Sequence, residues 1–153
     1  KIDNIKNIKL FIPRPKCTNL NAKTKIKKCD VSGKLLDIKL MNDASRIMLN
    51  HTNFKCFSKS KTDVKTYNCD LKYAKWNLND NELIFTIKAN RFLRNMVRAI
   101  VGTLIHVGLK KISLQDFEKI IISQDRTKAG PSAPAHALYL TNIFYPKEII
   151  LYE

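Results

Sequence analysis

The segment 91–107 carries apolar residues at helical spacing, so it needs a second layer of structure to cover them. At 100° per residue these side chains fall within an arc of about 180°. Asn90 is placed to cap the expected helix, and Gly108 is placed to end it. The apolar face consists of Phe92, Leu93, Met96, Val97, Ile100, Val101, Leu104 and Val107.

The opposite face of this expected helix carries Arg91, Arg94 and Arg98, together with Asn95 and Gly102. Three cations on one side repel one another unless anions lie opposite. The stripe therefore faces RNA phosphates or a carboxylate from elsewhere, or it is a solvated helix face. Gly102 favours the first interpretation, because a glycine inside a helix costs about 0.8 to 1 kcal/mol relative to alanine and often marks a close approach. The periodicity leaves both interpretations open.

Two further helices and three strands are predicted from shorter patterns. Asp37 is placed to cap a helix over 38–50, and Ser113 forms an S-x-x-D cap with Asp116 ahead of another. Alternating apolar residues predict a hairpin and a last strand, over 67–76, 82–89 and 138–146. This order of elements predicts an α+β domain in which helices cover one face of a mostly antiparallel sheet.

The first 34 residues are basic and weakly patterned, so we expect an irregular arm ahead of one α+β domain over 35–153. Within the arm, "IKLFIPRP" can make a short strand that Pro13 and Pro15 end. A second basic stretch, 51–66, has no sustained period and predicts a loop that carries Lys55, Lys59, Lys61 and Lys65. The aromatic residues among these lysines suit RNA stacking, although Phe54, Phe57 and Trp76 are more typical of a core.

The charge balance points to a polyanion as the partner. The chain has 28 Lys and Arg against 13 Asp and Glu, which gives a net charge of +15 and a pI near 9.8. Such a surface attracts nucleic acid through phosphate neutralisation and counterion release. A lysine-rich composition that raises the charge everywhere, without a site, is the alternative. No stretch is long and apolar enough to predict a membrane span, so we expect a soluble, cytoplasmic protein.

Few residues suggest chemistry on their own. The cysteines are scattered without a C-x-x-C pair, so we expect reduced thiols and no metal site. Phosphate-binding loops, nucleophile elbows and H-E-x-x-H pairs are absent from the sequence. Asp63 and Asp125 are loop carboxylates that are more typical of turns and caps than of catalysts.

Three blocks, taken in order and spacing, resemble the C-terminal half of the bacterial tRNA pseudouridine synthase A (TruA) family. They are "NFKCFSKSKTDVKT", "ANRFLRNMVRAIVGTLIHVGLKKISLQDFEKII" and "DRTKAGPSAPAHALYLTNIFYP". The resemblance runs from about Leu36 to Pro146. It implies a pseudouridine synthase-like half of an isomerase that uses no cofactor, detaches uracil from its ribose in the anticodon stem-loop of tRNA and rejoins it through carbon. It also implies a homodimer with two α/β halves per subunit and an active-site cleft between the halves.

The resemblance assigns roles to individual residues. Arg98 matches the arginine that pairs with the family's catalytic Asp, and a neighbouring cation favours an ionised carboxylate. Leu138 matches an apolar residue that walls the uracil pocket. For the RNA phosphates we expect contacts from Arg91, Arg94, Lys59 and Lys61.

The catalytic Asp itself belongs to a Gly-Arg-Thr-Asp-Ala/Thr-Gly motif in the family's other half, and this sequence has no such motif. We therefore expect this chain to be inactive alone. If the stretch "NAKTKIKKC" corresponds to the family segment with the active-site tyrosine, Lys27 or Cys29 stands where the resemblance implies an aromatic residue. The alternative is a basic RNA-binding domain that kept the fold and lost the chemistry.

Overall fold

The computed structural model describes residues 5–13, 36–60, 62–79 and 82–144. In this part of the chain, four strands form one antiparallel sheet in the order β2-β3-β1-β4. The strands are β1 (Ile5–Pro13), β2 (Leu71–Asn79), β3 (Glu82–Ala89) and β4 (Leu138–Phe144). The helices are α1 (Ile38–Met48), α2 (Met96–Gly108) and α3 (Leu114–Ser123), with short 3-10 turns η1 (Lys55–Phe57), η2 (Arg126–Lys128) and η3 (Ala135–Ala137).

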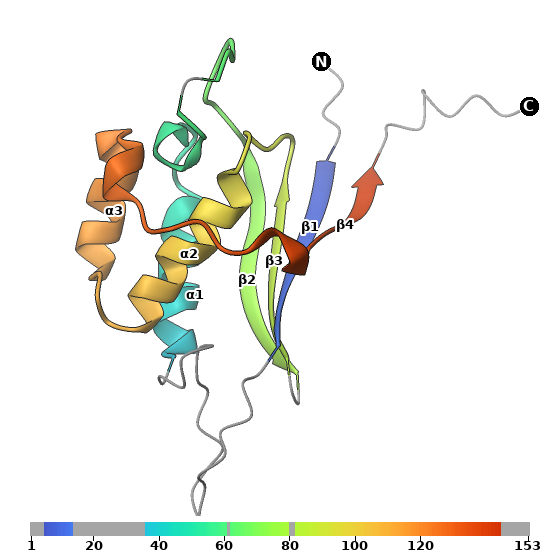
Figure 1. The fold of residues 1–153 in the computed structure, drawn as a ribbon, viewed down its shortest axis with the longest axis vertical. Coiled ribbons are helices and arrows are strands. Elements are labelled where there is room, and N and C mark those ends of the chain that lie inside the picture. Colours follow the sequence, from blue (N-terminus) through green and yellow to red (C-terminus); the bar gives the residue numbers. More distant parts are fainter. Residues whose placement is uncertain (1–4, 14–35, 61, 80–81, 145–153) are drawn as a thin grey trace, which may run out of the picture.

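Helices α1, α2 and α3 lie on the same face of this sheet (Figure 1). The predicted α+β class, with helices over one face of an antiparallel sheet, is therefore confirmed. Among the described residues, no helix has the length and apolar character that crossing a membrane requires.

The core between the helices and the sheet is built from the residues that the periodicity predicted. On α2, the side chains of Met96, Ile100 and Leu104 are fully buried. Phe54, Phe57 and Trp76 are buried as well, and the Trp76 ring packs on Phe85 at 4.7 Å between centroids. These three aromatic residues belong to the core and are not a stacking surface for RNA.

Two of the predicted helix starts are confirmed by their caps. The Asp37 carboxylate accepts a hydrogen bond from the Leu40 amide at 3.0 Å. The Ser113 hydroxyl accepts from the Asp116 amide at 3.1 Å and donates to the Asp116 carboxylate at 2.7 Å. In both cases a side chain satisfies an amide that the first helical turn leaves without a partner.

The predicted start of the arginine-bearing helix at Asn90 is wrong. Helix α2 begins at Met96, after Asn95 in a left-handed conformation with φ of 66°. The Asn90 side chain instead accepts from the Asp70 amide at 2.8 Å, while the Asn90 amide donates to the Asp70 carbonyl at 3.1 Å. Because Asn90 closes the end of the hairpin, Arg91 and Arg94 precede the helix, and the three arginines do not form one helical stripe.

Part of the expected N-terminal arm is a strand of the sheet. Ile5–Pro13 forms β1, which pairs with β3 on one side and β4 on the other. Ile8 lies opposite Ile87 of β3 and Leu140 of β4. The short strand considered for this segment is therefore present, and it lies inside the sheet between two strands from distant parts of the sequence. The rest of the expected arm, 14–34, lies outside the described residues.

Candidate functional site at the start of helix α2

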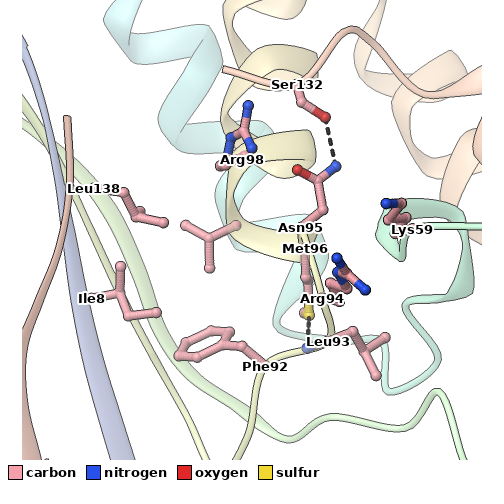
Figure 2. Close-up of a pocket in the computed structure, with 11 residues that line it drawn as sticks. Ile8, Lys59, Phe92, Leu93, Arg94, Asn95, Met96, Arg98, Ser132 and Leu138 are labelled. Atoms are coloured by element: carbon pink, nitrogen blue, oxygen red, sulfur yellow. Dashed lines mark hydrogen bonds between the residues drawn. The ribbon is translucent and has the colours of Figure 1, made fainter. Parts of the chain in front are cut away.

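A pocket of about 490 Å³ opens beside the first turn of α2. This volume is in the range of small-molecule sites. Figure 2 shows the apolar residues Ile8, Phe92 and Leu138 on one side of the pocket and the cationic residues Lys59 and Arg94 on the other. The pocket is lined by Ile8, Lys59, Phe92, Leu93, Arg94, Asn95, Met96, Val97, Arg98, Ser132 and Leu138.

Arg98 reaches this pocket from α2 with its side chain half-buried. Its Nε donates to the Ala133 carbonyl at 2.6 Å, and the Ala133 amide donates back to the Arg98 carbonyl at 2.9 Å. The first bond holds the guanidinium group by one of its five N–H donors, and the second joins the backbones of Ala133 and Arg98. Within the described part of the chain, none of the ion pairs includes Arg98. The remaining N–H groups have the geometry to bind an anion.

Arg98 is held by a segment of the chain, 129–133, that packs closely along α2. A Cβ placed on Gly102 would lie 1.7 Å from the Pro131 carbonyl oxygen, so only glycine admits this contact. The Gly130 amide donates to the buried Thr103 hydroxyl at 2.9 Å. Gly102 does mark a close approach, as its place inside a helix suggested, but the approaching group is the protein's own backbone and not an external anion.

Ser132 ties the same segment to two other parts of the fold. Its hydroxyl accepts from the Asn95 amide group at 2.6 Å, which Figure 2 shows as a dashed line, and from Arg126 Nη2 at 3.1 Å. Arg126 Nη1 also donates to the Gly130 carbonyl at 3.1 Å. The sequence reasoning missed Ser132 and Arg126 as members of the site. The sequence signal nearest to them was the Gly/Pro/Ala composition of this loop, and it does not say what the loop packs against.

The structure places the other expected site residues at different depths. Leu138 is half-buried and lines the pocket, while Lys59 and Arg94 are exposed at its edge, where the Lys59 amide donates to the Arg94 carbonyl at 3.0 Å. Arg91 does not line the pocket and lies near Cys69 instead. Lys61 lies outside the described residues, as do Lys27 and Cys29.

Two further expectations for titratable residues can be compared with the structure. Asp125 is a cap, because its carboxylate accepts from the Thr127 amide at 2.9 Å and the Thr127 hydroxyl at 2.7 Å; these bonds lower the Asp125 pKa. Cys56 and Cys69 are free, buried thiols, and burial raises the pKa of Cys56 to about 12. Neither thiol is a ready nucleophile, since the thiolate is the reactive form.

Comparison with known proteins gives the class of the molecule. Residues 48–146 match the tRNA pseudouridine synthase family. The chain therefore belongs to this family, as its sequence blocks indicated.

Proteins similar to this chain include several bacterial tRNA pseudouridine synthases A. The chain is 52% identical over 118 residues to that of Porphyromonas gingivalis and 53% identical over 115 residues to that of Bacteroides fragilis. It is 39% identical over 110 residues to the one from Bacillus licheniformis. These alignments cover 76%, 74% and 72% of this chain, but only 47%, 46% and 44% of the relatives. The chain thus spans about half the length of the curated relatives that it matches.

Proposed function

We propose that this chain supplies the C-terminal half of a tRNA pseudouridine synthase that isomerises uridine to pseudouridine in the anticodon stem-loop of tRNA. The observation that carries the proposal is Arg98, which is held by Ala133 at the wall of a pocket while most of its N–H donors stay available. The catalytic carboxylate comes from the Gly-Arg-Thr-Asp-type motif of the other half of the enzyme, which this sequence does not contain.

The pocket suits the roles that the family implies. A guanidinium group beside a carboxylate keeps that carboxylate ionised and fixes its orientation through a bidentate pair. The apolar side of the pocket, with Leu138 among Ile8 and Phe92, offers a surface for the flat face of a uracil ring. The family implies that the complete enzyme needs no cofactor for this reaction, because side chains from its two halves suffice to break the bond from ribose to nitrogen and make the bond to carbon.

The exposed cations at the edge of the pocket are proposed RNA contacts. Lys59 and Arg94 are exposed at the edge of the pocket, where they can meet the phosphates next to a bound uridine. Arg91 precedes Arg94 on the same segment. Lys61 is assigned to the same group from the sequence alone. As in the family, we place the complete enzyme in the cytoplasm as a homodimer that acts on tRNA.

A second candidate function is a non-catalytic basic RNA-binding domain. It is favoured by the absence of a carboxylate partner for Arg98 among the described residues. The two functions differ in one measurable property. Mass spectrometry of tRNA, incubated with the chain and a supplied N-terminal half, detects pseudouridine only if the chain supports catalysis.

Arg98→Ala should abolish turnover by the complete enzyme and leave tRNA affinity within about tenfold, because one contact among many phosphate contacts is lost. Turnover is measured by pseudouridine formation and affinity by a filter-binding titration. Arg46→Ala is the matched control, since Arg46 is exposed on α1, pairs with Asp43 and does not line the pocket, and it should keep turnover. Normal turnover in Arg98→Ala would refute the assignment.

The chain alone should form no pseudouridine at any salt concentration. The physical reason is that the pocket holds a cation and apolar walls, but the described residues place no carboxylate among its lining groups. Product in tRNA incubated with the chain alone, checked by the same mass spectrometry, would show that a nucleophile was overlooked.

A further inference from the structure

The polar face of α2 is occupied by the segment 129–133 of the same chain. Successive turns of the helix contact it in register: Arg98 pairs with Ala133, Gly102 admits Pro131, and Thr103 accepts from Gly130. The Thr103 hydroxyl in turn donates to the Ala99 carbonyl at 2.8 Å, so it is oriented by the helix itself. The carbonyl that holds Arg98 is thus part of the segment 129–133, whose backbone is held along α2.

At the end of this segment nearest the pocket, the Ser132 hydroxyl accepts two hydrogen bonds. Asn95 donates to Ser132 from the start of α2, and Arg126 donates to it from η2. Arg126 also donates to the carbonyls of Ala129 at 3.4 Å and Gly130 at 3.1 Å. Its guanidinium group therefore joins three residues of the loop. Ser132 directly precedes Ala133, whose carbonyl accepts from Arg98.

The Asn95 side chain bonds to Ser132 and does not cap helix α2. An asparagine before a helix commonly accepts from an amide of the first turn. Here the Asn95 side chain makes no such bond, and its backbone has φ of 66°, which few residues other than glycine and asparagine adopt readily. Its amide group points to Ser132 instead.

We propose that Asn95 and Arg126 are positioning residues that act through Ser132 on the orientation of the Arg98 guanidinium group. With both donors in place, the Ala133 carbonyl is held at the distance that Arg98 Nε requires. Without the Ser132 hydroxyl, the segment loses its bonds to Asn95 and Arg126, and Ala133 is held only by its own bonds to Arg98. The Arg98 side chain then samples other rotamers. The inference rests on the proposed function only for its catalytic consequence, because the orientation of Arg98 is a property of this chain.

The first experiment uses the chain as it is and reads Arg98 directly. In ¹⁵N-labelled protein, the Arg98 Nε–H signal is assigned by its loss in Arg98→Lys, and its exchange with water is measured. Ser132→Ala should speed this exchange about fivefold to tenfold, the factor that one hydrogen bond is worth. Ser132→Thr keeps the hydroxyl and should restore slow exchange. Ser123→Ala is the matched control, because Ser123 is half-buried and its hydroxyl donates to Ile120 within α3.

Arg126→Lys tests the junction from its other side, because a lysine keeps the charge and loses the fork that reaches three acceptors. It should speed Arg98 Nε–H exchange as Ser132→Ala does, while the amides of β2 and β3 keep their protection. Unchanged Arg98 exchange in both variants would overturn the proposal. Loss of protection across the whole domain would also overturn it, since that outcome indicates a general structural role.

The second experiment measures turnover in the enzyme completed with its N-terminal half. Ser132→Ala should lower kcat for pseudouridine formation about tenfold with little change in KM for tRNA, and Ser132→Thr should recover kcat. If kcat is unchanged in Ser132→Ala, the positioning role in catalysis is refuted. If Arg98 exchange responds as expected while the wild-type complex forms no pseudouridine, the proposed function fails and the positioning of Arg98 stands.

Discussion

Gly102→Ala is the substitution that most directly tests the packing of the 129–133 segment on α2. The added Cβ would lie 1.7 Å from the Pro131 carbonyl oxygen and 2.9 Å from its carbon. Ordinary contacts between heavy atoms are about 3.5 Å, so the segment has to move away by roughly 1.5 Å or more. A backbone carbonyl cannot rotate aside as a flexible side chain does.

The expected loss follows from the bonds that this movement breaks. Alanine in the middle of a helix gains about 1 kcal/mol over glycine. Against this gain, the two bonds between Arg98 and Ala133 and the bond from Gly130 to Thr103 are each worth about 1 kcal/mol. Overpacking adds further cost. The net result is a loss of about 2 kcal/mol, which lowers Tm by about 4 to 8 °C in a domain of this size.

Thermal unfolding followed by circular dichroism measures this loss, and Gly108→Ala serves as the matched control. A Cβ on Gly108 would meet Met41 Sδ at 2.5 Å, and a methionine side chain can shift. Gly108→Ala should therefore cost less stability and leave Arg98 in place. A Gly102→Ala protein as stable as the wild type would refute the described packing, because the helix-propensity gain would then be unopposed.

Two further predictions test the core and the sheet edge. Asn42→Leu should lower Tm by about 3 to 10 °C, because the Asn42 side chain accepts from the Trp76 amide at 2.8 Å and donates to the Trp76 carbonyl at 3.2 Å on edge strand β2. The control Asn50→Leu, at an exposed position, should keep the wild-type Tm. Equal Tm values for the two variants would refute this role of Asn42. The raised pKa of Cys56, about 12 against 9.0, means that the unfolded chain loses this proton first. The stability contribution is therefore complete below pH 9 and is lost between about pH 9 and 12. Urea unfolding against pH should show a shallower decline for Cys56→Ala, and identical slopes would contradict the assignment.

The elements that could be predicted from the sequence are those with local causes. Asp37 and Ser113 cap α1 and α3 through contacts three residues away, so a short stretch of sequence contains both partners. The hairpin of β2 and β3 is local in the same sense, because the paired alternating segments follow one another. The apolar arc of α2 was also visible, since burial of one helix face depends on its own spacing.

The features that escaped the sequence depend on distant partners. Strand β1 lies between two strands that come far later in the chain, and nothing in its own composition identifies them. Helix α2 begins at Met96 and not after Asn90, because the Asn90 side chain accepts a hydrogen bond from the Asp70 amide. The candidate site also depends on distant partners. Ser132 comes near Arg98 only because its loop packs on α2, and that packing requires a residue without Cβ at Gly102.

The three arginines that share one face of the expected helix have different surroundings in the fold. Only Arg98 belongs to α2, and only its position is held by a backbone carbonyl from the docked segment. Arg94 is exposed ahead of the helix, where a cation can move to meet a phosphate but cannot hold a carboxylate in one orientation. A fixed guanidinium group beside an apolar wall fits a counter-ion for a reacting group, and mobile cations at the edge fit a flexible polyanion. This difference in restraint, more than the shared charge, distinguishes the proposed catalytic arginine from the proposed RNA contacts.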